Sequence, residues 1–381
     1  MFLVSLLGFM VLGSEGDEEA AEQAEIIPGG GGGGSDGGPS PIPTPVQITA
    51  PQTPVSVDQL ICTVGDTAIF DRMVPLDGLC HYIYYTNVVV LKGELTAIKV
   101  SVSWNTFKAV LAGYKKTSGG IGFDVRYVDL TDLSAEVQAK LNDLYLRNVK
   151  HYGILNALET SSNLTDIFTK AKGLLKKLKN FQVRDDTQKT LLAFGIYNYL
   201  EDGAWETLQE VFASAVNDSV ADTVIAYSSV GWIEGPDECF SHPPSIFNKR
   251  RYLDEAFKEA GRAPDILGVS RMMTRDKEYK SGVKMGLSFE LGTLVYEVNT
   301  PTIPLDMVNA PCKTMYITSM DVLCIQLADR STNLRPGMAL LLVNAHLGDL
   351  STNSTCKDLG ERDREDPFWR IRVIKAELKI P

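Results

Sequence analysis

Basic residues, clustered histidines and long apolar runs are all scarce in this sequence. Its 381 residues include 37 Lys and Arg against 48 Asp and Glu, which gives a net charge of -11. Nucleic acid and anionic lipid both favour a basic surface, so we exclude them as partners. The four histidines, His81, His151, His242 and His346, show no H-x-x-H or H-x-x-x-H spacing. We therefore expect no metal site and no cofactor.

The N-terminus carries one short apolar run, Phe2–Leu12, which ends near the small residues Gly13, Ser14 and Gly16. The run is too short to span a bilayer, and its length fits the core of a signal peptide. We expect residues 1–16 to be a signal peptide, the mature chain to lack a membrane span, and the protein to be secreted and extracellular. No Lys or Arg precedes the run, so an incorrectly assigned start or a buried N-terminal helix stays open as the alternative.

Residues 17–57 differ in composition from the rest of the chain. An acidic stretch is followed by the glycine run Gly29–Gly34 and by Pro-, Thr- and Ser-rich sequence from Pro39 to Pro54. Few large apolar side chains are present there to offset the entropy of ordering, so we expect a disordered tail. A solvated spacer is the simplest interpretation, and a surface-anchoring or mucin-like role is the alternative. We expect one folded domain over residues 58–381.

Short apolar runs alternate with helical stretches downstream of the tail. This alternation is typical of a parallel sheet, and eight strands predict a closed α/β barrel, the (β/α)8 or TIM barrel. The predicted strands are Leu60–Val64, His81–Leu91, Ile121–Val128, Tyr152–Leu158, Thr190–Tyr197, Thr223–Ser229, Val283–Phe289 and Met338–Val343. Apolar spacing predicts outer helices over Ser134–Asn148 and Leu164–Leu178. Gly119 and Gly120 lack the G-K-S/T of a phosphate loop, and we interpret them as a turn into the third strand.

Several motifs, taken in order along the chain, resemble those of family 18 chitinases. They include L-I-C and L-C-H-Y-I-Y-Y on the first two strands and I-A-Y-S followed by G-W on the sixth. The matching segments are Leu60–Cys62, Leu79–Tyr85, Ile225–Trp232, Gly286–Phe289, Asp321–Cys324 and Gly337–Cys356. Their order and spacing carry the resemblance, which spans residues 58–356. It implies a glycoside hydrolase barrel built for chitin-type glycans.

The catalytic motif on the fourth strand decides what the resemblance implies for activity. Where the family carries D-G-x-D-x-D-x-E, this chain has Y-G-I-L-N-A-L-E, beginning at Tyr152. Gly153 and Glu159 match the family, and the aspartates are replaced by Tyr152, Leu155 and Ala157. In the family the glutamate is the general acid, a neighbouring carboxylate raises its pKa, and the last aspartate orients the substrate's N-acetyl group. The resemblance therefore implies that Glu159 is a vestigial general acid and that efficient hydrolysis is lost.

Other positions that hold sugar in the family have changed as well. Ser228 stands where the sixth strand supplies an aspartate, and Val343 stands where the last strand places the tryptophan on which a sugar ring stacks. Glu290 falls near the family's tyrosine on the seventh strand. We keep Tyr227, Trp232 and Glu290 as candidate binding residues.

The rim of the groove is expected to be reduced. The connection between the seventh and eighth strands, Glu297–Pro336, is short for the small α+β insertion of many family members. We therefore expect a reduced insertion between strands 7 and 8 and a shallower cleft. Trp205 joins Trp232 as an aromatic that we expect at the rim, although a tryptophan is more often part of a core.

Three functions are compatible with these losses. The first is a secreted, monomeric chitinase-like protein without hydrolytic activity that binds a chitin-type glycan or an extracellular protein. The second is a weakly active or altered glycoside hydrolase on N-acetylglucosamine-containing glycans, with Glu159 as acid and Glu290 or Asp124 as its partner. The third is a protein-binding module such as an enzyme inhibitor, a use that this barrel has in plants. An assay on fluorogenic chitobiose and chitotriose tests whether the protein is an altered hydrolase. A glycan array with a pull-down distinguishes the non-hydrolytic chitinase-like protein from the protein-binding module.

Cysteine and asparagine patterns both fit passage through an oxidising secretory pathway. The six cysteines are an even number, as expected for full pairing, and counting alone allows fifteen connectivities. Three N-x-S/T sequons, at Asn163, Asn217 and Asn353, are candidate glycosylation sites.

The family resemblance narrows the disulfide pairing. It implies that Cys62 is bridged to Cys80 and that Cys324 is bridged to Cys356. The two remaining cysteines follow strands 6 and 7, whose ends lie at the same face of a barrel. We therefore expect the set Cys62–Cys80, Cys239–Cys312 and Cys324–Cys356, with Cys312–Cys324 and Cys239–Cys356 as the competing pairs.

Overall fold

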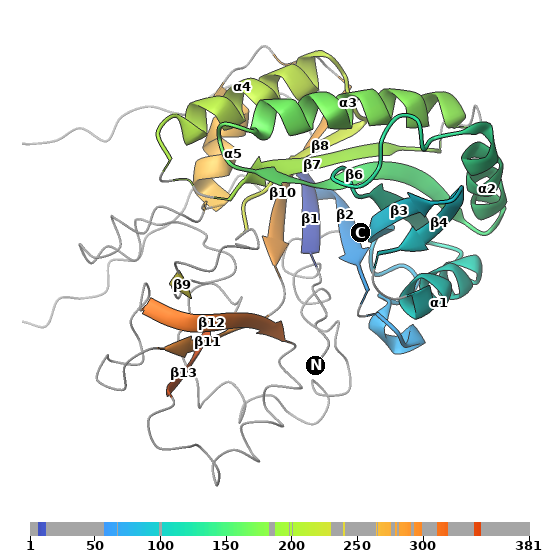
Figure 1. The fold of residues 1–381 in the computed structure, drawn as a ribbon, viewed down its shortest axis with the longest axis horizontal. Coiled ribbons are helices and arrows are strands. Elements are labelled where there is room, and N and C mark those ends of the chain that lie inside the picture. The colour runs from blue at the N-terminus through green and yellow to red at the C-terminus, as the bar shows by residue number, and fades with distance from the viewer. Residues whose placement is uncertain are drawn as a thin grey trace, which may run out of the picture.

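The computed structural model describes residues 7–12, 57–66, 68–98, 101–182, 187–197, 199, 201–229, 239–240, 264, 266–275, 279, 282–290, 293–298, 311–318 and 339–343. Strands and helices alternate through most of this part (Figure 1). The large sheet contains β1 (Leu7–Leu12), β2 (Val57–Val64), β3 (Tyr82–Leu91), β4 (Glu94–Ala97), β5 (Ser118–Phe123), β6 (Val149–Glu159), β7 (Thr190–Ile196), β8 (Thr223–Ala226) and β10 (Lys284–Glu290). The helices are η1 (Asp71–Met73), α1 (Ser101–Ala112), α2 (Ala135–Leu146), α3 (Leu164–Phe181), α4 (Ala204–Asn217) and α5 (Ile266–Arg275).

The strand pairings of the large sheet close into a ring. Strands β2, β3, β5, β6, β7, β8 and β10 pair side by side and parallel, in that order. Strand β1 then pairs antiparallel with both β10 and β2. A closed ring leaves none of these eight strands with an unpaired edge. The predicted α/β barrel and the parallel order of its first seven strands are confirmed.

The eighth barrel position differs from the prediction. The sequence predicts Met338–Val343 as the last barrel strand, but the strand found there, β13 (Ala339–Val343), pairs antiparallel with β11 (Thr293–Val298). The eighth position is held instead by β1, which lies within the predicted signal peptide. An apolar run identifies a segment that forms a strand, but it carries no information about which strand it pairs with.

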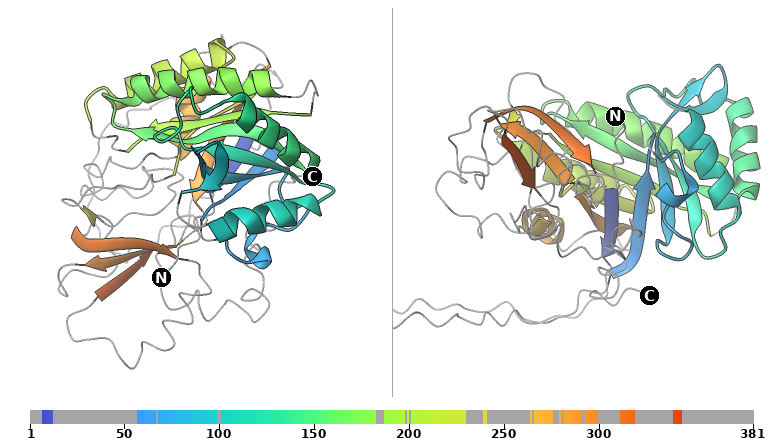
Figure 2. Two further views of the ribbon diagram at one scale, coloured as in Figure 1. Left: turned by 45° about the vertical axis from the view of Figure 1, so that its right-hand side comes forward. Right: turned by 90° about the horizontal axis from the view of Figure 1, so that it is seen from below.

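A second, smaller sheet follows the barrel strands. Its order is β13-β11-β12-β9, where β12 is Pro311–Thr318 and β9 is Cys239–Phe240. Figures 1 and 2 draw β11, β12 and β13 together as an antiparallel group apart from the helices of the barrel. The connection after β10 therefore carries two strands of its own, and the expected reduced insertion is not confirmed.

The helices cover the outer face of the barrel with apolar stripes. On α3 the buried residues recur at helical spacing, and the predicted helix over Leu164–Leu178 extends to Phe181. On α2 the Ser134 hydroxyl accepts a hydrogen bond from the Val137 N–H at 3.4 Å, which caps the helix at its predicted start. Figure 1 shows α3 and α4 side by side across β6, β7 and β8, and the two helices contact each other and the sheet.

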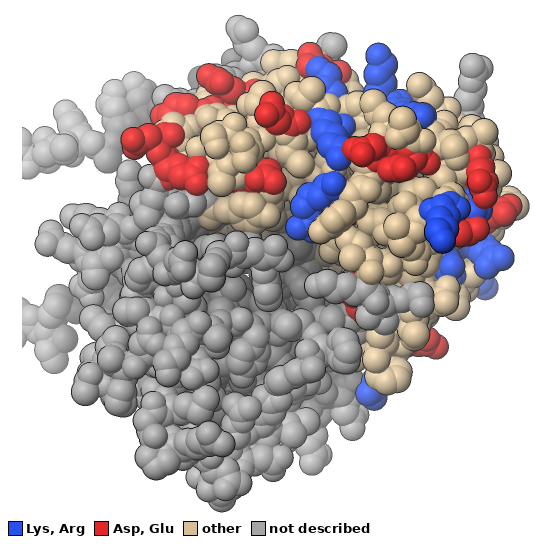
Figure 3. Space-filling view, viewed as in Figure 1, with Lys and Arg blue, Asp and Glu red and all other residues tan. Residues whose placement is uncertain are grey.

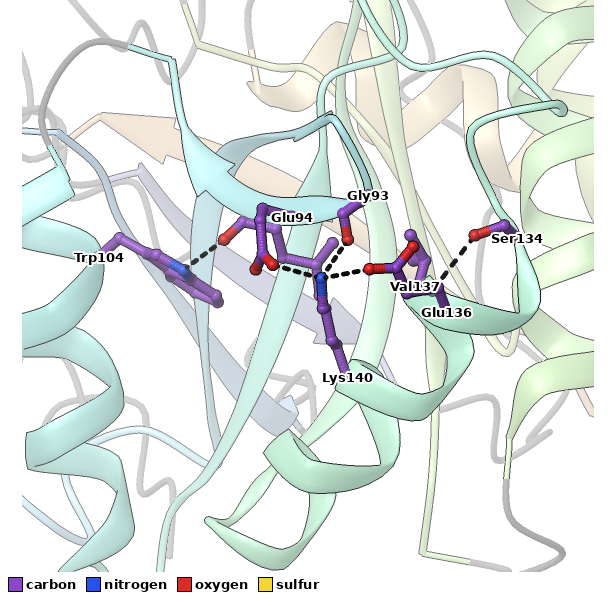
Figure 4. A network of polar contacts seen from close by, with 8 residues as sticks. Gly93, Glu94, Trp104, Ser134, Glu136, Val137 and Lys140 are labelled. Atoms are coloured by element: carbon purple, nitrogen blue, oxygen red, sulfur yellow. Dashed lines mark hydrogen bonds and ion pairs between the residues drawn. The ribbon is translucent and has the colours of Figure 1, made fainter.

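Strands β3 and β4 form a hairpin that α2 holds in place. The turn residues Lys92 and Gly93 both have positive φ, at 52° and 76°, as the tight hairpin turns with right-handed twist require. The Lys140 ammonium, on α2, donates to the Gly93 carbonyl at 2.6 Å and lies 2.6 Å from Glu94 and 3.2 Å from Glu136 (Figure 4). The Lys140 ammonium thus connects α2 to the hairpin turn at Gly93 and to β4 at Glu94.

Two glycines of β5 allow neighbouring side chains to enter the barrel. A Cβ on Gly120 would lie 2.4 Å from the Tyr84 ring, and one on Gly122 would lie 2.4 Å from the Leu155 side chain. Gly119 and Gly120 therefore belong to the strand itself, and their interpretation as a turn before it is wrong. Gly120 and Gly122 are thus needed for close packing.

Charge on the outer surface is mixed. On the face seen in Figure 3, acidic side chains of the described residues gather toward the α4 end, and lysines and arginines lie between them and further acidic groups. Several of these form exposed ion pairs, including Lys172 with Asp218 at 2.6 Å. Among the described residues, no helix is both long enough and apolar enough to cross a bilayer.

Candidate functional site

The inner face of the barrel is lined mainly by apolar and aromatic side chains. A cluster made of residues on the strands or directly after them consists of Ile61, Tyr84, Leu155, Leu191, Ala193, Ile225 and Tyr227, with Tyr82 and Leu158 half-buried against it. We call this the inner cluster. A separate, larger cluster joins strand residues to the helices, so the two clusters mark the two faces of the sheet. The C-terminal end of the inner face is where a (β/α)8 barrel presents its catalytic groups.

A bulge near the end of β6 changes which of its side chains face inward. Between Ile154 and Ala157, β6 advances by three residues while its partner β7 advances by two. One extra residue reverses the alternation of side chains beyond the bulge. Leu158 therefore packs with the inner cluster, whereas Glu159 stands opposite Ile196, whose side chain belongs to the outer cluster.

The structure therefore separates the residues of the strand-4 motif. Glu159 is half-buried on the outer face, and its backbone carbonyl accepts the Tyr197 N–H at 3.0 Å. Tyr152 and Ala157 are buried among outer-cluster residues, and Leu155 points into the barrel. At the C-terminal end of the inner face, β6 thus contributes Leu155 and Leu158, and no carboxylate.

Asp124, directly after β5, is the buried carboxylate that sequence analysis named as a possible partner for Glu159. Its side chain is fully buried and accepts two hydrogen bonds from the Arg126 guanidinium. Arg126 Nε lies 3.1 Å from Oδ1 and Arg126 Nη2 lies 2.9 Å from Oδ2. It also accepts the Arg126 backbone N–H at 3.0 Å. The hydrogen bond with Asp124 raises the pKa of Arg126, so the guanidinium stays charged. Asp124 is therefore engaged in a fixed ion pair.

Tyr227 fills the barrel interior. Its side chain is 3% exposed, and its hydroxyl donates to the Leu155 carbonyl. A Cβ on Gly195 would lie 2.7 Å from the Tyr227 Cβ, which shows how closely β7 approaches it. Next to it, the Ser228 N–H donates to the Ser288 hydroxyl at 2.9 Å, so the segment just after β8 is linked to β10. Both residues pack and connect strands.

Tyr127 is an exposed aromatic residue at the same end of the barrel. It lies in the loop after β5, its side chain is 62% exposed, and the Arg126 guanidinium carbon lies 5.5 Å from its ring centroid. Sequence analysis missed this residue, although its position just after a barrel strand is a usable signal. Trp205, expected at the rim, is half-buried with its ring centroid 4.8 Å from that of Tyr199.

The two described histidines stabilise the sheet. The Nδ1 atom of His81 accepts the Leu60 N–H at 3.0 Å, and the Nδ1 atom of His151 accepts the Lys189 N–H at 3.0 Å. The other ring nitrogen of His151 lies 2.7 Å from the Ser118 hydroxyl. Within the described part of the chain, no group of three or more His, Cys, Asp or Glu side chains is placed to hold a metal ion.

The remaining predicted sites fall partly outside the described residues. The sequon asparagines Asn163 and Asn217 are exposed, next to α3 and at the end of α4, and their glycosylation stays a prediction. Among the residues that the sequence analysis names, Trp232, His242, Cys324, His346, Asn353 and Cys356 lie outside the described residues. For Cys239, Glu290, Cys312 and Val343 the structure describes the backbone only.

The cysteines fit the predicted pairing as far as the structure describes them. Cys62, on β2, and Cys80, just before β3, form a disulfide with a Cα–Cα distance of 6.0 Å, which confirms that prediction. Cys312 and Cys239 are direct partners in the antiparallel register of β12 and β9. Such partners have Cα atoms about 4.5 to 5.5 Å apart, within the range that a disulfide requires. The Cys239–Cys312 bridge stays a prediction.

Comparisons with known proteins find likeness in three dimensions only. No protein-family model matches the chain, and no curated protein matches its sequence. Among solved structures, an immunomodulatory active chitinase from Trichuris suis has 13% sequence identity and a TM-score of 0.44, covering 71% of this chain and 77% of its own.

Two further solved structures are similar over comparable lengths. Human YKL-39, described as a pseudo-chitinase with retained chitooligosaccharide binding properties, has 10% identity and a TM-score of 0.46, covering 82% of this chain and 99% of its own. The second catalytic domain of the Group II chitinase of Ostrinia furnacalis has 12% identity and a TM-score of 0.42, covering 72% and 75%. This chain is thus similar in structure, at low identity, to chitinases and to a pseudo-chitinase.

Proposed function

We propose that this chain is a secreted chitinase-like protein without glycoside hydrolase activity, which acts by binding a carbohydrate or another extracellular protein. The observation that carries the proposal is the direction of the β6 side chains. Leu155 and Leu158 face the barrel interior, and Glu159 lies on the opposite face of the sheet. The residue best matched to the family's general acid is thus turned away from the place where a glycan would be cleaved.

The chemistry of glycoside cleavage explains why this arrangement matters. A general acid must lie within hydrogen-bond reach of the glycosidic oxygen and must have a pKa near the operating pH. A substrate-assisted reaction also needs a group that orients the N-acetyl carbonyl of the sugar. Leu155, Leu158 and Tyr227 occupy the inner face, and Asp124 is already paired with Arg126. These residues supply neither the acid nor the orienting group.

Binding has support at the rim of the barrel. The exposed Tyr127 ring offers an apolar face on which a sugar ring can stack, and the neighbouring Arg126 supplies hydrogen-bond donors. Both follow β5 at the C-terminal end of the strands, where barrel proteins bind their ligands. We therefore propose a chitin-type oligosaccharide as the first ligand to test, with an extracellular protein as the alternative.

The test of the missing activity uses fluorogenic chitobiose and chitotriose. The wild-type protein and the Glu159→Gln variant are both expected to show no turnover above a buffer blank. Turnover by the wild type that disappears in Glu159→Gln would overturn the proposal and support the alternative of an altered hydrolase.

The test of binding uses calorimetric titration with chitotetraose. Tyr127→Ala is expected to weaken binding about fivefold, since one aromatic contact contributes about 1 kcal/mol. Leu146→Ala, at the exposed end of α2, is the control and should bind as the wild type does. If the wild type shows no heat of binding at millimolar glycan, the ligand is not a chitin-type sugar and the protein-partner alternative replaces it.

A further inference from the structure

The base of the barrel, where the parallel strands begin, is held in part by one buried histidine. His151, on β6, is 1% exposed. Its Nδ1 atom accepts the backbone N–H of Lys189, just before β7, at 3.0 Å. Its Nε2 atom lies 2.7 Å from the hydroxyl of Ser118, the first residue of β5. One side chain therefore connects β6 to the starts of both neighbouring strands.

Side chains take part in the pairing of β6 with β7 at the base. In a parallel pair, the backbone N–H and C=O groups of the two strands bond to each other, as the Tyr152 N–H does to the Lys189 carbonyl at 3.1 Å. One step nearer the base, the Lys150 carbonyl accepts the Gln188 side chain at 3.1 Å, and the Lys189 N–H donates to His151. The pairing at this end of the two strands thus depends on an imidazole nitrogen as acceptor.

The two contacts fix the protonation state of the ring. A backbone N–H can only donate, so Nδ1 must carry a lone pair and no proton. In a neutral imidazole the proton is then on Nε2, which donates to the Ser118 hydroxyl. This assignment excludes Ser118 and His151 as a nucleophile and its base, because a general base needs a lone pair on the nitrogen that faces the hydroxyl. His151 therefore supports the sheet only as a neutral imidazole.

Acid removes the acceptor. An unperturbed imidazole takes up a second proton at about pH 6.5, and the imidazolium has a donor at both nitrogens. A protonated His151 would point an N–H at the Lys189 N–H, and two donors cannot bond. The ring can therefore take up the proton only when the start of β7 has moved away from β6. The open form binds one more proton than the closed form, so opening becomes easier by up to about tenfold for each pH unit below about 6.5.

The side chains that face the ring carry no charge that would hold an imidazolium in place. Tyr82 and Tyr84, on β3, face it with ring centroids at 4.6 and 6.2 Å. Burial raises the pKa of both tyrosine hydroxyls, so both stay neutral at neutral and acidic pH. The neighbouring Lys150 on β6 extends toward α2, where its ammonium lies 5.4 Å from the Tyr145 ring centroid.

One carboxylate, that of Asp222, acts on Tyr82 and Tyr84 through its charge. It stands directly before β8 and accepts the Thr190 N–H at 2.7 Å and the Thr190 hydroxyl at 2.8 Å. The Lys179 ammonium lies 3.5 Å from its other oxygen. These donors and this cation already compensate Asp222, so little of its charge is left to stabilise an imidazolium.

We propose that His151 is an acid-sensitive latch at the base of the barrel. The neutral ring closes the start of β7 onto β6 at neutral pH, and protonation below about pH 6.5 releases it. The stability that the latch contributes is thus present above this pH and is lost as the pH falls. The latch lies at the N-terminal ends of the strands, opposite the candidate binding site, so this inference does not depend on the proposed function.

The experiment is hydrogen exchange measured by mass spectrometry on the full-length chain, with rates corrected for the intrinsic effect of pH on exchange. The two conditions are about pH 7.5 and about pH 5, on either side of the ordinary histidine transition. Peptides from the starts of β6 and β7 report on the latch, and peptides from α1 report on global unfolding. The wild type is expected to lose protection about tenfold or more at the starts of β6 and β7 in acid, with α1 unchanged.

His151→Asn separates the latch from other effects of acid. The asparagine side-chain oxygen can accept the Lys189 N–H in place of Nδ1, and it does not titrate. Protection at the starts of β6 and β7 is therefore expected to be the same at both pH values in this variant. His81→Asn is the matched control, because the His81 Nδ1 atom accepts the Leu60 N–H at 3.0 Å and so serves the pairing of β2 with β3. It should leave the acid response of β6 and β7 as in the wild type.

Either of two results would overturn the proposal. Equal protection of the wild type at both pH values means that acid does not open the base. An acid response that persists in His151→Asn means that another group causes it. If His151→Asn does not fold, nuclear magnetic resonance of the wild type with isotope-labelled histidine decides. The neutral Nε2–H form of the buried ring must then persist until β7 loses protection, and a ring that becomes imidazolium while β7 stays protected rules the latch out.

Discussion

Leu155 shows at the scale of one residue why the barrel interior does not readily accept a carboxylate. Its side chain is 3% exposed and lies against the backbone of Gly122, where even a Cβ would be 2.4 Å away. A carboxylate in the place of this leucine would need a polar partner there. Tyr227 is near, but its hydroxyl already donates to the Leu155 carbonyl.

Leu155→Asp combined with Ala157→Asp is therefore expected to destabilise the protein and leave it inactive on chitobiose. The two new carboxylates would face opposite sides of the sheet, because Leu155 is in the inner cluster and Ala157 in the outer one. An unpaired buried charge costs several kcal/mol, which approaches the stability margin of a domain. Thermal unfolding followed by circular dichroism measures the loss, with Leu146→Asp on exposed α2 as the control. A stable double variant with robust hydrolysis would show that the family groove is intact.

Asp77 is a second residue with a defined electrostatic role. Its carboxylate accepts backbone N–H groups of Lys115, Lys116 and Thr117 at 2.8 to 2.9 Å. Partial burial acts to raise the pKa of Asp77, but these three donors and the charge of Lys116 lower it by more, so the net pKa is below the ordinary 3.8. A lowered pKa in the folded state stabilises the fold when the group is ionised.

Asp77→Asn is therefore expected to reduce stability at neutral pH by about 1 kcal/mol, a value discounted for solvent exposure. The difference from the wild type should persist while the pH is above 3.8 and disappear as the pH falls through the lowered pKa. Urea unfolding at a series of pH values measures it. A difference that grows on acidification would contradict the assigned role.

Elements of this fold are positioned by contacts that reach across the sequence. Strand β3 continues past its parallel partners into the hairpin with β4, and Lys140 on α2 is bonded to the hairpin turn. Trp104 on α1 donates from its indole N–H to the Leu95 carbonyl at 3.1 Å, so two helices anchor the same hairpin (Figure 4).

Lys140→Met is expected to loosen the hairpin while the barrel stays folded. The substitution keeps most of the apolar stem and removes the donor to Gly93 and the two glutamate contacts. Hydrogen exchange in β4 should rise, and the effect should shrink at high salt because exposed ion pairs are screened. Lys172→Met, which removes an exposed lysine paired with Asp218, is the matched control and should leave β4 unchanged.

At the scale of the whole molecule, disulfides test the chain path most directly. The Cys62–Cys80 bridge is present, and the β9–β12 register brings Cys239 opposite Cys312. Non-reducing peptide mapping should therefore find Cys62–Cys80, Cys239–Cys312 and Cys324–Cys356. Cys312 joined to Cys324 would contradict the β9–β12 pairing, and Cys62 joined to any cysteine beyond residue 200 would contradict the strand order of the barrel.

Local sequence was enough to locate most elements. The first seven predicted strands and the helices α2 and α3 were found within a few residues of their expected bounds, because apolar periodicity and helix caps are properties of adjacent residues. The sequence likewise shows directly that Tyr152, Leu155 and Ala157 stand at the three aspartate positions of the motif.

Only the tertiary structure decided which face Glu159 occupies and which segment closes the barrel. The bulge in β6 depends on its register with β7, and one inserted residue reverses every side chain beyond it. The eighth position depends on which segment pairs with the edges of β2 and β10, and those edges exist only once the other strands have assembled. Sequence alone located seven of the barrel strands, and long-range pairing determined the partners of the strands and the direction of their side chains.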